Sequence, residues 1–376
     1  MAYNWTFKFF PGDVVFTDVL SFSGSLGRQN YNDNYAGGSF NITIKNNNNQ
    51  VANFTRGKGI KITLASGASI FQGIITNIDF NDDQGNTGLS TATITCVDLI
   101  TVAGKTTLKN FTYPAAKTIT QAKYTNSLPD YVTPTIQEGP LAGSTLGLSD
   151  ASAAASYSGT ILNRVNLLCQ TEKGLLEANE SYIYFLSRAD IATNPITVAL
   201  TRSTVSSTTI AYENIKRIQA GDNFYNQVTV VPESVAEQQA NNTTSQTAYG
   251  LAGYQISTVD ATTTQASGLA SYLSIMQGDP TTLRYEVTFT DVANTTDAFA
   301  DILYRLRFTF EVMLSLQWQA QGQSLQTVNT IFEGMSFSGT PSETRITLYL
   351  SPSEYYQNFI LNSSVFGILD TSRLSW

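Results

Sequence analysis

Apolar residues in the first hundred positions recur at every second residue, in short runs that polar turns separate. Three runs place their large side chains on one face of an extended chain: Trp5, Phe7 and Phe9; Phe40, Ile42 and Ile44; and Ile60, Ile62 and Leu64. Alternation with a period of two residues is typical of strands that are buried on one face. Short strands joined by turns rich in Gly, Asn and Asp predict a β-sandwich or a β-barrel.

Two segments change to the period of an α-helix. Apolar residues at 161–169 fall on one helical face, with Ser158 or Thr160 as the N-cap and Gly174 just past the end. A second helix is predicted over 266–276, because Gly278 and the Asp-Pro that follows it stop the pattern.

The rest of the chain returns mostly to strand patterns. Strands are expected within 175–177, 182–186, 196–231, 284–290, 303–318, 330–337 and 345–350. Residues 106–157 show few regular apolar positions and four prolines, so we expect a linker or an irregular insertion there. Residues 232–247 carry no apolar face and are expected to form a surface loop.

These patterns predict a mainly β protein with a few short helices. With 376 residues the chain is long enough for two or three domains of roughly 100–200 residues each. We expect two β-barrel or sandwich domains and a small α+β insertion. The expected segments are an N-terminal barrel (1–104), an irregular insertion with a helix and a hairpin (105–190), a second barrel (191–350) that carries a loop-and-helix insertion (232–280), and a C-terminal tail (351–376).

The composition excludes several classes of enzyme. The chain has no histidine, which removes Ser-His-Asp and Cys-His nucleophiles and histidine-ligated metals. Its two cysteines, Cys96 and Cys169, are too few for a disulfide framework or a thiolate metal site. We therefore expect no catalytic residues, no bound metal and no cofactor.

Charge and hydropathy limit the partners and the location. The chain has 21 Lys and Arg against 29 Asp and Glu, a net charge of −8, which argues against DNA or an anionic membrane as a direct binding partner. It shows neither a signal-peptide pattern at its start nor the run of about 18 apolar residues that a membrane helix needs. Synthesis in a host cytoplasm without membrane insertion is the expectation.

Acidic residues offer two further candidates for chemistry. Asp79, Asp82 and Asp83 resemble half of a calcium loop but lack the distal bidentate Glu, so a solvated turn is the simpler interpretation. A glycosidase could use two of the carboxyls among Glu172, Glu177 and Glu333, and aromatic residues (19 Tyr, 20 Phe and 3 Trp) could line a sugar groove. Such aromatics are more often core and interface anchors in a β-rich chain.

The last twenty residues, with the pair Tyr355 and Tyr356 just before them, are too apolar for a solvated tail. Such a segment packs either on its own domain or on a neighbouring subunit, and the sequence leaves both interpretations open.

Several motifs occur in an order that resembles the minor tail or tail-tip (baseplate) hub proteins of long-tailed bacteriophages. They include the strand 69–76, the helix-to-hairpin segment 161–188, the strand 225–230 and the ending 365–374, where the family has "LDTxRL". A Gly-Asp turn that many members carry before the late strands is missing from 305–311. The motif residues that we take as candidates for assembly are Phe71, Gly73, Glu172, Gly174, Asn226, Phe366, Gly367, Leu369, Asp370, Arg373, Leu374 and Trp376.

The resemblance implies a structural virion protein. In such hubs two tail-tube-like β-barrels per chain, in a homotrimer, give a pseudo-sixfold ring at the virion tail tip. The ring caps the tail tube and meets the distal tail protein, the tape-measure protein and the receptor-binding or fibre proteins, while genomic DNA only passes through. Because this chain stops two residues after Leu374, we expect another protein to recognise the host.

Two other functions remain open at this point. A carbohydrate-binding β-sandwich adhesin predicts an exposed row of aromatic side chains, and a carboxylate-type glycosidase predicts one deep cleft with two carboxyls. The hub predicts two halves of similar fold within one chain.

Overall fold

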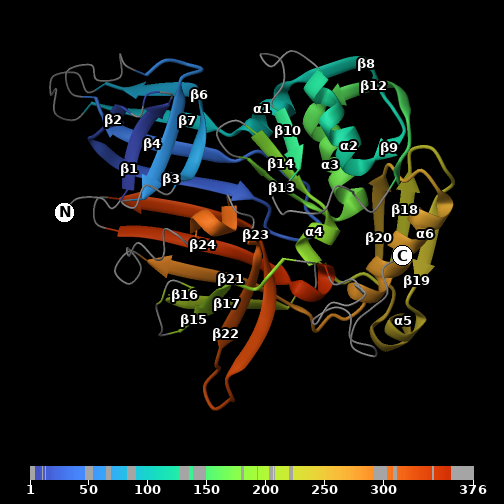
Figure 1. The fold of residues 1–376 in the computed structure, drawn as a ribbon. Coiled ribbons are helices and arrows are strands. Elements are labelled where there is room, and N and C mark those ends of the chain that lie inside the picture. The colour runs from blue at the N-terminus through green and yellow to red at the C-terminus, as the bar shows by residue number, and fades with distance from the viewer. Residues whose placement is uncertain are drawn as a thin grey trace.

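The molecule consists of two β-rich halves with helical segments on one side of them (Figure 1). The structure is a computed structural model. It describes residues 5–10, 12, 14–46, 54–64, 69–82, 90–127, 135–138, 150–178, 182–192, 194–202, 206, 208–219, 223–290, 303–307, 311–340 and 343–356.

The two halves supply seven strands each to one large sheet of 14 strands. The strands of the N-terminal half are β1 (Trp5–Phe10), β2 (Val14–Phe16), β3 (Val19–Gly27), β4 (Ser39–Lys45), β5 (Gly59–Leu64), β6 (Ser69–Asn81) and β7 (Thr91–Val97). Those of the C-terminal half are β15 (Val198–Thr201), β16 (Thr209–Ala211), β17 (Asn214–Gln219), β21 (Leu283–Thr290), β22 (Met313–Trp318), β23 (Gln326–Thr340) and β24 (Glu343–Pro352).

Two insertions complete the described chain. The first contains α1 (Leu99–Lys105), β8 (Thr107–Tyr113), β9 (Ala116–Lys117), α2 (Thr118–Lys123), a 3-10 turn (Tyr124–Ser127), β10 (Thr135–Glu138), β11 (Asp150–Ala151), β12 (Ala154–Thr160), α3 (Ile161–Glu172), β13 (Leu175–Ala178), β14 (Tyr182–Leu186) and α4 (Arg188–Ala192). The second contains β18 (Gln227–Pro232), β19 (Gln238–Asn241), α5 (Thr243–Tyr249), β20 (Gly253–Thr258) and α6 (Thr263–Met276), and a 3-10 turn (Ser353–Tyr356) follows β24.

The halves repeat the same arrangement of five antiparallel strands. In space the order is β3-β4-β7-β6-β5 in the first half and β17-β21-β24-β23-β22 in the second. Numbered along the chain, both orders read 1-2-5-4-3. The long strands β6 and β23 even share a bulge at the same place, after Ile75 and after Phe332 respectively. The flanking strands differ, since β1 runs antiparallel to β5 whereas β15 runs parallel to β22.

One strand pair joins the halves. β3 pairs antiparallel with β23, from Phe22 opposite Gly339 to Gly27 opposite Gly334, so β23 contacts three neighbouring strands along its 15 residues. Because of this pairing, the hydrogen-bonded ladder of the described residues continues from one half into the other. Among the described residues, neither half closes into a separate barrel.

The strands predicted from alternation are confirmed except for the first part of 303–318, and both predicted helices are confirmed. Along β1, Trp5, Phe7 and Phe9 are buried, and the residues between them are half-buried. α3 begins after Thr160, whose hydroxyl accepts a hydrogen bond from the Asn163 amide at 3.1 Å. The left-handed residue that ends α3 is Lys173 (φ 52°), one position before the predicted glycine.

For residues 106–157, the described part fits an insertion better than a linker, because it contains β8, α2 and β12, and α2 and β12 pack on α3. Two predictions from the sequence are wrong. The expected loop 232–247 contains β19 and most of α5, which the side chain of Asn242 caps. The expected strand 303–318 begins as a helical turn at 303–307, where Leu303 and Leu306 are buried at helical spacing.

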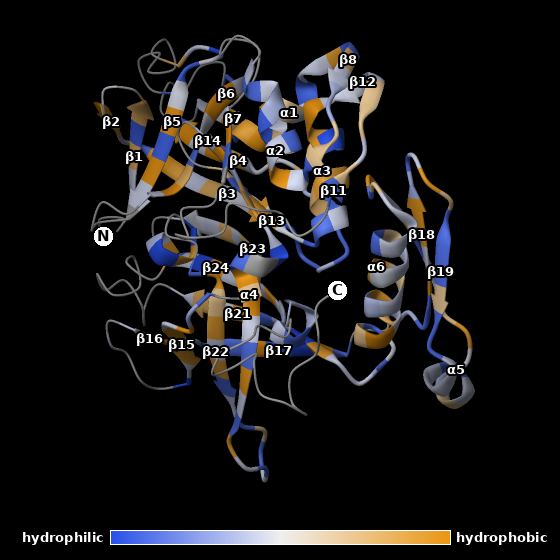
Figure 2. Ribbon diagram, turned by 45° about the vertical axis from the view of Figure 1, so that its right-hand side comes forward, coloured by the Kyte–Doolittle hydropathy of each residue, from blue (hydrophilic) through white to orange (hydrophobic). Residues whose placement is uncertain are grey.

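Hydrophobic and hydrophilic positions alternate along many of the strands (Figure 2), and the buried hydrophobic residues form one core cluster that includes residues of both halves and both insertions. Helix α3 packs against α1, α2 and β20, and α6 covers β18 and β19. None of the described helices is long and apolar enough to cross a membrane.

The strand pair that joins the halves leaves no room for a side chain at Gly334. A Cβ atom there would lie 2.4 Å from the carbonyl oxygen of Leu26, a backbone atom. We therefore expect Gly334→Ala to lower the free energy of unfolding by about 2–3 kcal/mol in urea denaturation. Gly253→Ala is the control, since its Cβ would meet only the end of the Gln227 side chain at 3.6 Å. Equal stability of both variants would contradict the close approach of the β3 and β23 backbones at Gly334.

Candidate functional site: the junction between the halves

A buried arginine and glutamate join the halves next to the β3–β23 pair. Arg28 follows Gly27, whose φ of 71° turns the chain out of β3. The Arg28 amide donates to the Glu333 carbonyl at 3.0 Å, and Arg28 Nε donates to Glu333 Oε2 at 2.7 Å. Glu333 is the bulged residue of β23, and the bulge turns its side chain towards Arg28. Both side chains are about 1% exposed or less.

The 3-10 turn after β24 completes this ion pair. Arg28 Nη2 donates to Tyr356 Oη at 2.7 Å, and Tyr356 in turn donates to Glu333 Oε1 at 2.8 Å. The guanidinium also lies over the Tyr35 ring, 4.8 Å from its centroid. Burial by itself lowers the pKa of Arg28, but Glu333 and the two tyrosines outweigh it and raise that pKa well above its usual value.

Lys173 is the second buried cation of this junction. Its Nζ donates to Gln170 Oε1 at 2.8 Å and to Asn32 Oδ1 at 3.3 Å, and it lies 5.0 Å from the centroid of the Tyr31 ring. Burial, helped by the charge of Arg28, lowers the pKa of Lys173 to about 7. A cation held by neutral oxygens in this way costs free energy in the folded state at neutral pH.

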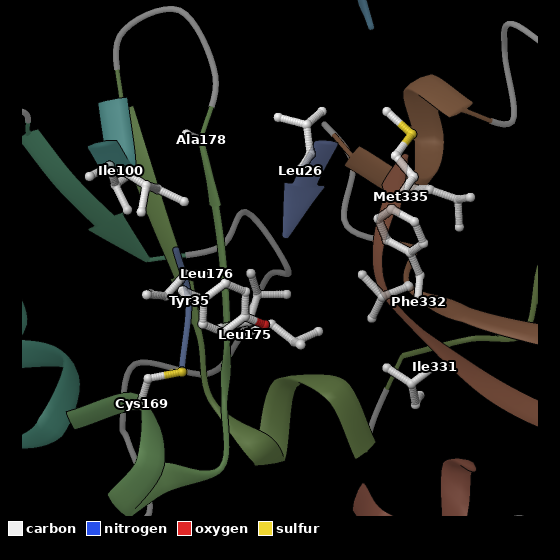
Figure 3. Close-up of a cluster of buried hydrophobic side chains, with 14 of the residues drawn as sticks. Leu26, Tyr35, Ile100, Cys169, Leu175, Leu176, Ala178, Ile331, Phe332 and Met335 are labelled. Carbon is white, nitrogen blue, oxygen red and sulfur yellow. The ribbon is translucent and has the colours of Figure 1, made fainter. Parts of the chain in front are cut away.

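Side chains from both halves and from the first insertion meet here in one core (Figure 3). Leu26 comes from β3, Leu175 and Leu176 from β13, and Phe332 and Met335 from β23. The packing of three parts of the chain around one ion pair makes the junction a structural joint.

The three carboxylates considered for catalysis are engaged within the fold. Glu333 binds Arg28, and Glu177 accepts hydrogen bonds from Arg307 at 2.9 and 2.5 Å. Thr118 donates to Glu172 Oε2 at 3.0 Å. Burial raises the pKa of Glu177, which the charge of Arg307 partly offsets. The arrangement therefore favours ion pairs that support the fold over an acid–nucleophile pair.

Most of the described aromatic side chains are buried in the hydrophobic core. Trp5, Phe7, Phe22, Phe40 and Phe337 form one buried group with ring centroids 4.8–6.5 Å apart. The exposed aromatic residues of the described chain come from four different elements or turns rather than one row: Phe80, Tyr124, Tyr249 and Tyr304. The aromatic row of an adhesin is thus absent from the described residues.

The predicted assembly candidates that the structure describes lie inside the fold. Phe71 stacks on Phe40 at 5.2 Å, and Asn226 donates to the Gly250 carbonyl at 2.7 Å. Gly73 and Gly174 each face a backbone carbonyl that a Cβ atom would approach within 2.3 Å. Their part in assembly stays a prediction. The remaining candidates lie outside the described residues: Phe366, Gly367, Leu369, Asp370, Arg373, Leu374 and Trp376.

Sequence reasoning missed Arg28, Lys173 and Tyr356 as members of this junction. The one available signal was composition, because only 13% of the chain is charged and a charge within an apolar pattern then stands out. Spacing gives no such signal, since Arg28 and Glu333 are 305 residues apart.

Comparisons of the structure show that this fold occurs in phage tail proteins. A tail protein from Neisseria meningitidis matches with a TM-score of 0.63 and 10% identity, over 94% of this chain and 98% of that one. The 43 kDa tail protein of prophage MuSo2 from Shewanella oneidensis matches with a TM-score of 0.58, 10% identity and the same coverage.

A third solved structure extends this likeness to secretion machinery. An Escherichia coli protein matches with a TM-score of 0.54 and 9% identity, over 92% of this chain and 76% of that one. It is described as a component of the type VI secretion system with structural similarity to the T4 bacteriophage tail proteins gp27 and gp5. By sequence, no protein-family model matches the chain, and no curated protein matches it either.

Removing one partner of the buried ion pair should destabilise the protein strongly. We expect Arg28→Met to lower the free energy of unfolding by about 3–5 kcal/mol, because Glu333 is left as an unpaired buried charge. The double variant Arg28→Met with Glu333→Gln should lose less than the sum of the single losses. Lys117→Met breaks an exposed pair with Asp150 and should cost less than 1 kcal/mol. A loss of less than 1 kcal/mol for Arg28→Met would contradict the role of this ion pair in holding the halves together.

Stability should depend on pH through Lys173. Its pKa is about 7 in the folded protein against a usual 10.5, so between pH 7 and 8 this lysine binds more protons in the unfolded chain than in the folded one. The free energy of unfolding should therefore rise with pH, by about 1 kcal/mol per unit. Lys173→Met should remove the rise, whereas Lys109→Met, at an exposed lysine of β8, should keep it. A rise that survives in Lys173→Met would place its origin elsewhere.

Proposed function

We propose that this chain is a structural hub of a phage tail tip, a ring-forming protein without catalytic activity. The observation that carries the proposal is the repeated five-strand arrangement within one chain. Two similar units per chain are what the hub predicts, and neither the adhesin nor the glycosidase predicts them. The likeness of the fold to phage tail proteins over more than nine-tenths of the chain supports the same function.

The repeat explains how a trimer would fit a sixfold tube. Three chains with two units each present six nearly equivalent units around one axis, so the ring matches a tail tube of sixfold symmetry without needing six chains. In this proposal the two tail-tube-like barrels are completed in the ring, where the open sheet of one chain continues into the next.

The proposed partners are those of a tail tip. The ring would cap the tail tube, meet the distal tail protein and the tape-measure protein, and support receptor-binding or fibre proteins. A net charge of −8 on each of three chains would keep passing DNA from adhering to the ring.

The purified chain should form a trimer of about 123 kDa, three times the chain mass of 40.9 kDa, because in the proposed ring each chain pairs its open strand edges with those of its neighbours. Light scattering in the micromolar range measures the mass, and negative-stain microscopy should show rings with a six-lobed outline. Antibodies against the chain should label one end of the tail in particles from its host. A stable monomer with affinity for sugars would contradict the hub and favour the adhesin.

A further inference from the structure

β6 has an edge equivalent to the edge of β23 that joins the two halves, and no described strand pairs with it. In β23, β22 covers the first part of one edge up to Ile331, and β3 covers the same edge from Gly334 onwards. In β6, β5 covers the first part of the corresponding edge up to Ile74. In the part of the chain that the structure describes, no strand covers that edge from Asn77 to Asn81.

The strand that would fill this edge also exists within the chain. β17 stands in the second half where β3 stands in the first, and each pairs with its next strand along one edge. The other edge of β3 binds β23, whereas the other edge of β17 faces no strand among the described residues. Its residues are exposed or half-exposed throughout.

The register of the missing pair follows from equivalent rows across the two sheets. One row runs through Gly24, Phe40, Cys96 and Ile75. The equivalent row runs through Arg217, Tyr285, Leu350 and Phe332.

Both rows end on the residue before the bulge, so Arg217 corresponds to Gly24, and Phe80 corresponds to Phe337. Since Gly24 pairs with Phe337, Arg217 should stand opposite Phe80. The neighbouring positions then place Lys216 opposite Asn81 and Ile218 opposite Asp79.

We propose that β17 of one copy pairs antiparallel with the open edge of β6 of the next copy, in this register. The occupant is a second copy of the same chain, and the pairing rests on the proposed hub function, for which it supplies the contact between subunits. A contact between two different edges is head-to-tail, so it continues from copy to copy and forms a ring when the rotation closes.

Charge complementarity supports this occupant. Asp79 and Asp82 are exposed on β6 and just after its end, and Lys216 and Arg217 are exposed on β17. In the inferred register Lys216 lies diagonal to Asp79, and Arg217 lies diagonal to Asp82, within reach of long side chains. Lys216 now contacts Glu286 within its own sheet, with 63% of its side chain exposed.

Phe80 provides a second, apolar argument. It is 57% exposed, whereas its counterpart Phe337 is 3% exposed because β3 covers it. Arg217, its partner in the inferred register, already lies over the Trp318 ring, 3.9 Å from the centroid. Pairing would therefore bury Phe80 beside a guanidinium that is positioned on an aromatic ring.

The position of the two edges suits a chain of contacts. β6 lies in the half drawn uppermost and β17 in the half drawn below it, in both views of the molecule (Figures 1 and 2). One copy can therefore bind a neighbour through β6 and another neighbour through β17. Open edges that bind nothing invite uncontrolled aggregation, and a closed ring would satisfy both.

Cysteine cross-linking tests the register directly. Directly opposed residues of antiparallel strands have Cα atoms about 4.5–5.5 Å apart, within the range of a disulfide. The variant with Asn81→Cys and Lys216→Cys should therefore form covalent dimers and trimers after mild oxidation, seen on non-reducing gels. The control with Asp79→Cys and Lys216→Cys is two residues out of register and should cross-link much less. The native Cys96 and Cys169 are buried, so oxidation of the wild-type chain gives the background level of cross-linking.

Charge reversal gives an independent measurement of the same contact. Asp79→Lys with Asp82→Lys should lower the oligomeric mass in light scattering, as should Lys216→Glu with Arg217→Glu. The variant that carries all four reversals should assemble again, because every contact in the ring then pairs a basic β6 edge with an acidic β17. The aspartates lie at an exposed strand end, so the variant with only Asp79→Lys and Asp82→Lys should remain folded, with the circular dichroism spectrum of the wild type.

The outcomes separate the contact from the function. A trimer that forms without the in-register cross-link and ignores both charge reversals overturns the β17–β6 pairing and leaves the hub standing. A chain that stays monomeric at tens of micromolar overturns both. Cross-linking in register, together with restored assembly in the variant with all four reversals, supports the pairing whatever the number of chains in the ring.

Discussion

The pairing of β3 with β23, fixed by the ion pair of Arg28 with Glu333, is the contact on which the rest of the structure depends. It carries one sheet through both halves and brings the first insertion and the 3-10 turn after β24 onto the same core. The joint combines close backbone approach at glycine with a fully satisfied buried charge pair. Such a pair is costly to break but specifies one register, because a shifted strand would leave both charges unpaired.

Because the arrangement is repeated, the strand pairing that joins the halves can also recur between chains. The same five strands occur twice. In the second half β3 occupies the edge of β23, whereas among the described residues no strand occupies the equivalent edge of β6. Growth by addition of identical chains then needs no new type of interface, which agrees with a proposed role in a ring on a tail tube.

Much of the fold could be predicted from the sequence, because half-buried strands and capped helices leave local patterns. Trp5, Phe7 and Phe9 show the alternation directly, and Thr160 marks the start of α3. The helical turn at 303–307 was hidden because its apolar residues run into those of β22. The joint could not be predicted, since Arg28 and Glu333 come together only in the fold. The repeat leaves no pattern in the residues either, because equivalent positions such as Gly24 and Arg217 share no chemistry. It was expected only from the resemblance to tail hub proteins.

Hydrogen exchange measured on separated monomeric and oligomeric fractions would test the central claim most directly. The claim is that one type of strand pairing acts twice, once within the chain and once between chains. The account predicts that the amides of β3 and β23 are protected in both fractions, while those of β17 and of β6 from Asn77 to Asn81 gain protection only in the oligomer. Protection of β17 and β6 that stays unchanged on assembly would contradict it.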